Sequence, residues 1–254
     1  MCGRIQITNP VEAISNLFDD LDVSDYTSGQ ADWPYSFNIS PSAFLPLIVQ
    51  SAHGLSLKAA HWGFIPSWAK DKKFAANSIN ARLETAFEKP YYKSAIRQRR
   101  ALLPVTAYYE WKTIAGAKQP FRFHLPNLQP MYFACIWEDW INPQIRTPMT
   151  SFAILTTEAD QQAFPLINQV NHRMPLLLSP SVRRNWLANG VESFRGQLNK
   201  DIIENTQLMV HPVSKQLNKA VNQGPELAEP INLSDIKHET AYARTHSDQG
   251  DLFN

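Results

Sequence analysis

The most informative segment of the chain reads Ala101-Leu102-Leu103-Pro104-Val105-Thr106-Ala107-Tyr108-Tyr109-Glu110-Trp111. Its aliphatic, β-branched and aromatic residues predict a single strand over Ala101–Trp111. The same signals, with turn residues between them, predict strands at 3–8, 44–50, 55–62, 121–124, 131–137 and 152–156. Because strands outnumber helices and do not alternate regularly with them, we expect an α+β fold on a curved mixed or antiparallel sheet with flanking helices, rather than a Rossmann-type fold.

Helical signals are fewer. Asn9 followed by Pro10, with Glu12 three positions after Asn9, is typical of a capped helix start and predicts a helix of about ten residues. Weaker patterns predict helices over 158–166, 182–187 and 200–204, and an acidic loop over 19–34.

Composition limits the possible classes of protein. The 254 residues, with 44% hydrophobic content and a net charge of +1, fit one domain over residues 1–232 and a flexible polar tail over 233–254. The two cysteines, Cys2 and Cys135, are too few for a disulfide framework or a zinc site, and Cys135 lies in an apolar run typical of a buried thiol. No stretch predicts a membrane span or signal peptide, so we expect a cytoplasmic protein.

The N-terminus combines two reactive groups. Removal of Met1, which a small second residue permits, leaves Cys2 with a free α-amine and a thiol on adjacent carbons. The unperturbed pKa values are ~7.7–8.0 for such an amine and about 8.5 for the thiol. The pair can condense with an aldehyde and close to a thiazolidine, or the thiol can attack an acyl carbon with the amine as base. The alternative is that Cys2 is an ordinary small residue at a chain end.

A basic segment lies between Trp62 and Arg100. It holds nine Lys and Arg residues against three Asp and Glu residues, interleaved with aromatic residues that include Trp68. Cations beside exposed aromatic rings are what a single-stranded nucleic-acid groove needs, and Pro66 suggests a turn that presents Trp68. The alternative is a solvated charged face over core aromatics.

Other side chains could bind or transfer protons. Asn80 and Arg82 would share a face of an extended segment, where an amide and a guanidinium suit phosphate or sugar oxygens. Glu110 lies among aromatic residues, where burial would raise its pKa for proton transfer, or it could face water at a sheet edge. His172 beside Arg173 is a candidate general acid, and His211 is a weaker one. We expect catalysis by side chains alone, with no metal or cofactor, because glycine-rich phosphate loops, G-x-S-x-G and H-E-x-x-H are absent from the sequence.

Six motifs together resemble the SRAP (SOS response-associated peptidase) family over about residues 2–230. They are Met1-Cys2-Gly3-Arg4, Trp62-Gly63-Phe64-Ile65-Pro66, Asn80-Ala81-Arg82-x-Glu84-Thr85, Tyr109-Glu110-Trp111, Arg173-Met174-Pro175-Leu176 and His211-Pro212-Val213-Ser214. The resemblance implies one α+β domain that senses abasic sites in single-stranded DNA and traps them as a covalent thiazolidine on the N-terminal cysteine, with Schiff-base chemistry of the lyase type. The alternatives are a cysteine peptidase or amidase with an N-terminal nucleophile, able to remove its own Met1, and a non-covalent binder of single strands.

The resemblance also implies roles for particular residues. Cys2 would be the nucleophile, with Asn80 and Glu110 as its catalytic neighbours. The remaining roles are contacts with DNA, in which Arg4 and Arg82 hold phosphates and Trp68 lies against a base. Lys70, from the basic segment, is a further candidate for DNA binding.

The family's catalytic histidine stands two residues before the arginine of the R-x-P motif. In this sequence that place holds Asn171, and His172 follows it. Either His172 takes the role through a local register shift, or Asn171 substitutes as a hydrogen-bond donor.

The C-terminal tail carries one further motif. Gln249-Gly250-Asp251-Leu252-Phe253 resembles the short peptides by which bacterial proteins dock on the replication sliding clamp. Leu252 and Phe253 are large apolar residues in an otherwise polar tail, and tethering would concentrate the domain where single strands are exposed. The sequence therefore predicts the sliding clamp as a partner through Gln249, Leu252 and Phe253, although the tail could also fold back on the domain.

Overall fold

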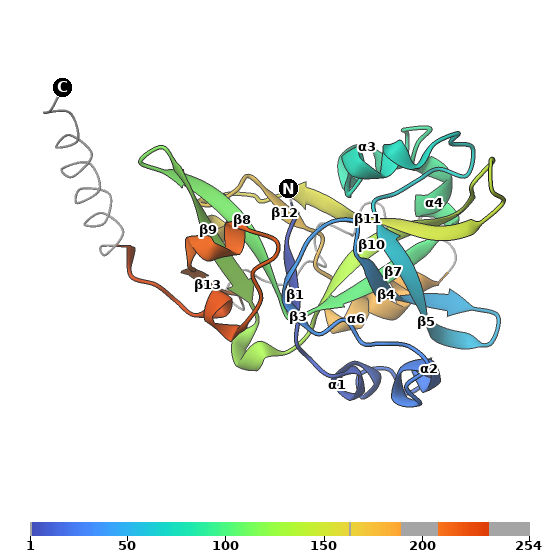
Figure 1. Cartoon of the computed structure of the whole chain (residues 1–254), viewed down its shortest axis with the longest axis horizontal. Coiled ribbons are helices and arrows are strands. Elements are labelled where there is room, and N and C mark those ends of the chain that lie inside the picture. Colours follow the sequence, from blue (N-terminus) through green and yellow to red (C-terminus); the bar gives the residue numbers. More distant parts are fainter. Residues whose placement is uncertain (1, 163, 189–207, 234–254) are drawn as a thin grey trace, which may run out of the picture.

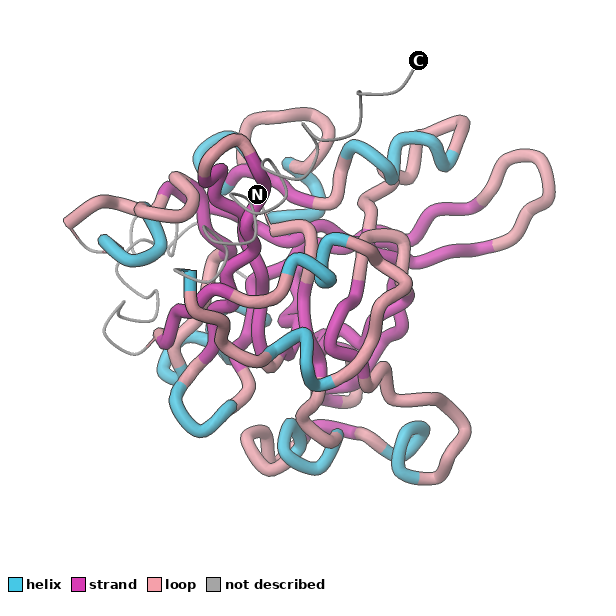
Figure 2. Tube along the Cα trace, turned by 60° about the vertical axis from the view of Figure 1, so that its left-hand side comes forward, coloured by secondary structure: helices cyan, strands magenta, loops and turns pink. Residues whose placement is uncertain are grey.

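Two sheets make up the fold. The computed structural model describes residues 2–162, 164–188 and 208–233. Within them, a five-stranded sheet has the order β13-β9-β8-β1-β3, and a larger sheet follows the path β12-β11-β10-β7-β4-β5-β2, with β6 pairing to β11. Figure 1 shows the two sheets side by side, and Figure 2 shows strands through the interior with short helices around them. This arrangement confirms the expected α+β class.

The strands are β1 (Ile5–Ile7), β2 (Leu21–Asp22), β3 (Ser36–Ile39), β4 (Phe44–Ser51), β5 (Gly54–Trp62), β6 (Asn80–Arg82), β7 (Arg100–Val105), β8 (Ala107–Ile114), β9 (Ala117–His124), β10 (Met131–Ile141), β11 (Pro148–Glu158), β12 (Arg173–Pro175) and β13 (Met209–Pro212). The α-helices are α1 (Val11–Ser15), α2 (Ser24–Thr27), α3 (Leu83–Ala86), α4 (Lys93–Gln98), α5 (Pro165–Asn168) and α6 (Pro180–Leu187). The 3₁₀ helices are η1 (Lys72–Asn77), η2 (Pro126–Leu128), η5 (Lys215–Asn218) and η6 (Pro225–Ala228).

The segment 101–111 passes from one sheet to the other. The prediction of one strand there is wrong, because β7 ends at Val105 and β8 begins at Ala107 in the other sheet. Between them, the buried Thr106 side chain accepts hydrogen bonds from the backbone amides of Thr8 (2.8 Å) and Asn9 (3.1 Å). Thr106 therefore anchors the crossing to the end of β1.

The larger sheet curls on itself. Beyond its neighbour β10, β11 also pairs in parallel with β5, so that Phe152 lies opposite Trp62. This extra pairing joins strands that are distant in the sheet order and makes a partly closed barrel. Its interior is filled by the apolar faces of β4, β7, β10 and β11, which are buried almost throughout.

Two predicted helices differ from the structure. The helix after Asn9 has only five residues, and Asn9 does not cap it, because its Oδ1 accepts from Thr106 and its Nδ2 donates to the Leu128 carbonyl. The helix predicted over 158–166 is wrong, because Glu158 ends β11 by pairing with Arg173 and α5 begins only at Pro165. The helix predicted at 200–204 and the tail motif at 249–253 lie outside the described residues.

Candidate active site

Strand β8 carries Glu110 into the interior. Side chains alternate along a strand, so Tyr108 and Glu110 share one face while Tyr109 and Trp111 share the other. Tyr109 and Trp111 accordingly pack with Val213 in a separate cluster. The Glu110 side chain is only 2% exposed, so the alternative that it faces water is wrong. Burial raises the pKa of Glu110, while a hydrogen bond from Asn171 lowers it in part.

Cys2 is also fully buried, at the end of the chain that leads into β1. Burial raises the pKa of its thiol, the negative charge of Glu110 raises it further, and a hydrogen bond from the backbone amide of Arg4 opposes both effects. From β6, the Asn80 side chain donates its Nδ2 to the Cys2 carbonyl oxygen at 2.8 Å. The Asn80 Oδ1 is buried and has no hydrogen-bond partner among the described residues.

Asn171, rather than His172, faces the same site. Its Nδ2 donates to Glu110 Oε2 at 2.7 Å, and its Oδ1 accepts from the backbone amide of Arg173 at 3.1 Å. Because both ends of the amide have partners, its orientation is fixed with the donor toward the carboxylate. His172 is exposed and lines a different pocket.

The Tyr108 side chain completes the buried group. Its ring stacks on Phe123 with centroids 4.7 Å apart and meets Phe133 edge-on at 5.7 Å. Its hydroxyl is buried and has no hydrogen-bond partner in the described part of the chain. Burial raises the pKa of Tyr108 well above its usual value, and negative charge on Glu110 and Cys2 raises it further.

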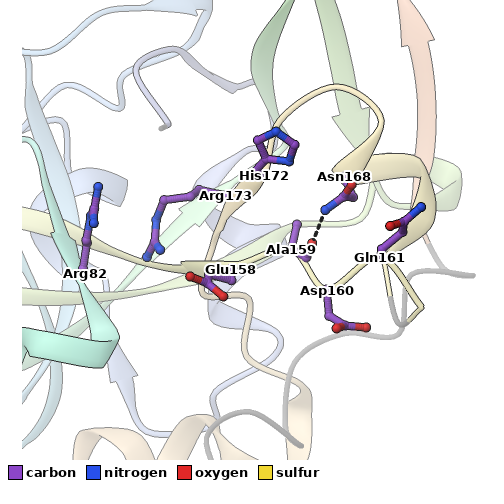
Figure 3. A pocket seen from close by; sticks show the side chains of 8 residues that line it. All are labelled: Arg82, Glu158, Ala159, Asp160, Gln161, Asn168, His172 and Arg173. Atoms are coloured by element: carbon purple, nitrogen blue, oxygen red, sulfur yellow. Dashed lines mark hydrogen bonds between the residues drawn. The ribbon is translucent and has the colours of Figure 1, made fainter.

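A pocket of about 450 Å³ adjoins this site along β6, β11 and the start of β12. Arg82 stands two residues after Asn80 on β6, and His172 directly follows Asn171. Figure 3 shows Arg82, Arg173 and His172 in the upper part of the pocket. Glu158 and Asp160 lie below them, so the lining carries both signs of charge.

Two of the sequence motifs meet beside this pocket. Arg173 Nη2 donates to Glu84 Oε2 at 2.9 Å and to the Thr156 carbonyl at 2.8 Å. The Arg173 side chain is therefore held against Glu84, whereas Arg82 is exposed. The sequence analysis did not predict that Glu84 would pair with Arg173, although their opposite charges made such a pair possible.

Arg4 has partners within the protein. Its Nη1 donates to the Asn38 Oδ1 at 2.5 Å and to the Leu217 carbonyl at 2.7 Å, and its guanidinium lies 5.9 Å from the centre of the Trp111 ring. Asn38 is 2% exposed and also donates to the carbonyls of Lys219 and Asn222. Arg4 thus connects the N-terminal strand to η5, a role that sequence reasoning missed.

The basic segment is exposed in part. Trp68 lies within a turn that is closed by a hydrogen bond from the Ala69 amide to the Pro66 carbonyl; it is 60% exposed and packs edge-on against Phe74 at 5.9 Å. Lys70 and the other lysines of the segment are exposed. Arg100 departs from the expectation, because it is buried and binds backbone carbonyls at the end of α6.

His211, the weaker acid candidate, belongs to the β9–β13 pairing. Its Nε2 lies 3.1 Å from the Ala228 carbonyl oxygen, and its ring meets His124 edge-on at 5.3 Å. Burial lowers the pKa of both histidines. In the described ranges, no three His, Cys, Asp or Glu side chains come together as a metal site.

Cys2, the second residue of the chain, is buried with a carboxylate and two amides at the contact of a small sheet with a curled larger one, and this arrangement defines the class of protein. The chain belongs to the SRAP family, described as SOS response associated peptidase, whose family model matches residues 1–220.

None of the helices in the described ranges is long and apolar enough to cross a membrane.

Curated relatives carry a common name. The chain is 29% identical to the abasic site processing protein YoqW of Bacillus subtilis over 236 residues, which cover 90% of this chain and 99% of that protein. It is 28% identical to the abasic site processing protein YedK of Escherichia coli, covering 91% of this chain and 100% of the relative. It is 25% identical to the abasic site processing protein HMCES of Gallus gallus, covering 82% and 70%.

A solved structure shows the same fold. A crystal structure of a protein from Bacteroides thetaiotaomicron superposes with a TM-score of 0.78 at 20% identity, covering 91% of this chain and 100% of the other.

Proposed function

We propose that this protein processes abasic sites in single-stranded DNA by forming a thiazolidine crosslink through Cys2 after removal of Met1. The observation that carries the proposal is the enclosure of Cys2 with the Glu110 carboxylate, whose pKa is raised, and with the amides of Asn80 and Asn171. The names of the relatives supply the substrate class. The aldehyde of a ring-opened abasic sugar is the group that an N-terminal aminothiol captures.

The chemistry proceeds in two bond-forming steps. The Cys2 amine attacks the aldehyde carbon, and the resulting carbinolamine loses water with a proton from the protonated Glu110, which leaves an iminium ion. The Cys2 sulfur then attacks the same carbon and gives its proton to the Glu110 carboxylate, which closes the ring. One water is released in total and Glu110 ends as it began, so a carboxyl group with a raised pKa suits both transfers.

The two amides position the reacting groups. Asn80 holds the Cys2 carbonyl, and its unpartnered Oδ1 is an acceptor suited to the Cys2 amine that removal of Met1 exposes. Asn171 directs one oxygen of Glu110 but cannot transfer a proton itself. Proton transfer in this chain is therefore assigned to Glu110.

The binding surface for the DNA strand is proposed from the exposed charges and rings around the site. Arg82 in the adjoining pocket and Lys70, two residues after Trp68, are exposed cations for backbone phosphates. Trp68 offers an exposed ring for an unstacked base. Arg4 is also proposed to contact a phosphate, while its guanidinium keeps its hydrogen bonds to Asn38 and the Leu217 carbonyl.

The crosslink is tested with an abasic single-stranded oligonucleotide on denaturing gels, after mass spectrometry has confirmed that Met1 is absent. We expect a covalent band that Cys2→Ala abolishes and that Cys135→Ala, which removes the other cysteine, retains. An added N-terminal residue that blocks the amine should also abolish the band. An equally strong band with Cys2→Ala would refute the mechanism.

The family description, which includes the word peptidase, favours one alternative. In it, the Cys2 thiol attacks a peptide carbonyl with its own amine as base. The same preparations, incubated with casein and short peptides, distinguish the two reactions. Peptide cleavage that depends on Cys2, without any DNA crosslink, would establish the peptidase instead.

A further inference from the structure

The Tyr108 hydroxyl is a buried hydrogen-bonding group without an evident structural task. Buried hydroxyl groups in folded proteins nearly always have a partner, and those that lack one call for an explanation. The ring itself is firmly held, by stacking on Phe123 and by the edge contact with Phe133. The oxygen is therefore kept in one place by contacts that do not involve it.

Two observations place the Tyr108 side chain on the side of the strand that faces Glu110 and the main core. Tyr108 stands two residues before Glu110 on β8, and so projects from the same face of the strand. Cys2 and Tyr108 belong to the same buried cluster, whereas Tyr109 belongs to another. In agreement with this placement, negative charge on Cys2 or Glu110 raises the pKa of Tyr108, after burial itself.

We propose that the Tyr108 hydroxyl donates a hydrogen bond to the Cys2 sulfur as the thiol loses its proton, and thereby acts as a positioning residue for the nucleophile. The inference rests on the proposed function of Cys2 and adds a donor to it. The sulfur's proton passes to the Glu110 carboxylate, and the Tyr108 O–H then partners the thiolate until the sulfur bonds to carbon.

A further donor would stabilise the negative charge on the Cys2 sulfur. Burial and the Glu110 charge both raise the pKa of the Cys2 thiol, and the backbone amide of Arg4 is a donor that opposes them. The positive α-amine at the start of the chain also lowers the pKa of Cys2, and negative charge on Cys2 raises the pKa of Tyr108 and of the buried Cys135 thiol. Asn80 and Asn171 donate elsewhere, to the Cys2 carbonyl and to Glu110. Among the groups whose pKa responds to charge on Cys2, Tyr108 is the one whose hydroxyl is buried and has no hydrogen-bond partner among the described residues.

The test is the pH dependence of Cys2 alkylation by iodoacetamide, followed on the N-terminal peptide by mass spectrometry in protein lacking Met1. Tyr108→Phe removes one oxygen and keeps the ring stacking. We expect its alkylation midpoint to move to higher pH and its rate at neutral pH to fall roughly tenfold, as loss of one hydrogen bond to a charged atom predicts.

Tyr132→Phe is the matched control, because the Tyr132 hydroxyl is also buried without a partner among the described residues, and its ring packs on Phe18 and Arg183. Its profile should coincide with that of the wild type. Melting temperatures show that each variant is folded.

Coincident profiles for Tyr108→Phe and the wild type would overturn the proposal, as would an equal shift in Tyr132→Phe. Crosslinking of abasic DNA in the same preparations separates this inference from the proposed function. A shifted alkylation profile in a protein that never crosslinks would leave Tyr108 as a donor to Cys2 while refuting the crosslink. A normal crosslink with unshifted alkylation profiles would support the proposed function while refuting the role of Tyr108.

Discussion

Replacing Asn38 by alanine should detach the C-terminal part of the domain from the N-terminal strand. Asn38 Oδ1 accepts from the Arg4 guanidinium at 2.5 Å, and its Nδ2 donates to the carbonyls of Lys219 at 3.0 Å and Asn222 at 2.9 Å. All these bonds lie within a side chain that is 2% exposed. Truncation to alanine removes all three of these hydrogen bonds.

The expected loss follows from these contacts. Two bonds to neutral carbonyls contribute about 1 kcal/mol each, and one bond to a charged group about 1.5–3 kcal/mol. We therefore expect Asn38→Ala to lower the free energy of unfolding by ~3–5 kcal/mol, a large part of the ~5–15 kcal/mol typical of a whole domain. Arg4, left with the Leu217 carbonyl, should lose its fixed position, and crosslinking should slow as well.

Urea unfolding measures the effect, with an unchanged dependence on urea concentration as evidence that the same structure unfolds. Asn218→Ala is the control, because Asn218 lies in the same segment and bonds Trp111 from an exposed position. Its loss should be about 1 kcal/mol or less. A loss below about 1 kcal/mol for Asn38→Ala as well would refute the argument that these bonds hold the two segments together.

Four further predictions follow from the site, the binding surface and the tail. Burial raises the pKa of Glu110, so its contribution to stability is full below the pKa of the unfolded chain and is lost as pH rises through the folded pKa. Glu110→Gln should therefore have the same free energy of unfolding in urea as the wild type at acid pH and a higher one at neutral pH, and it should fail to crosslink. Stability curves that run parallel across this pH range would contradict the prediction. Asn171→His places a proton-transferring group against Glu110 and should make the crosslinking rate depend on a second titration, so an unchanged pH profile would count against the assigned geometry. Arg82→Ala should weaken binding alike for all DNA sequences and reduce the salt dependence by about 0.7 in a plot of log affinity against log salt, whereas a sequence-dependent loss would exclude a phosphate contact. A peptide of residues 248–254 should bind purified sliding clamp, and replacing both Leu252 and Phe253 by alanine should abolish that binding; no binding at high micromolar peptide would end the proposal.

The sequence predicted strands well and their boundaries less well, for physical reasons. Local enrichment found β4 and β5 almost to the residue. It joined β7 and β8 into one strand, because the break at Thr106 depends on bonds to Thr8 and Asn9, which are remote in sequence. The short strands β6, β12 and β13 are held by pairing with β11 and β9 rather than by their own composition.

The residues of the candidate site could be named from the sequence, but their geometry could not. The motifs named Cys2, Asn80 and Glu110, and the structure places them together with Asn171. The choice between Asn171 and His172 could not be made from sequence, because it depends on which of two adjacent side chains faces Glu110. The position of Tyr108 on the same strand face as Glu110 could have been inferred from the sequence, because the two residues are two positions apart in a strand.

The place of β1 in the small sheet has a mechanical consequence. β1 begins three residues after Cys2 and pairs on both sides, with β3 and with β8, and its antiparallel hydrogen bonds run across the direction of the strand. If a DNA strand is attached to Cys2, any pull on that strand by a moving motor enters the protein along β1. The bonds on both sides then share the load in shear, rather than opening one after another as at a peeled edge. If Cys2 is the point of attachment, it is thus fastened to the fold by an interior strand of the small sheet, and the attached DNA strand pulls against the whole small sheet.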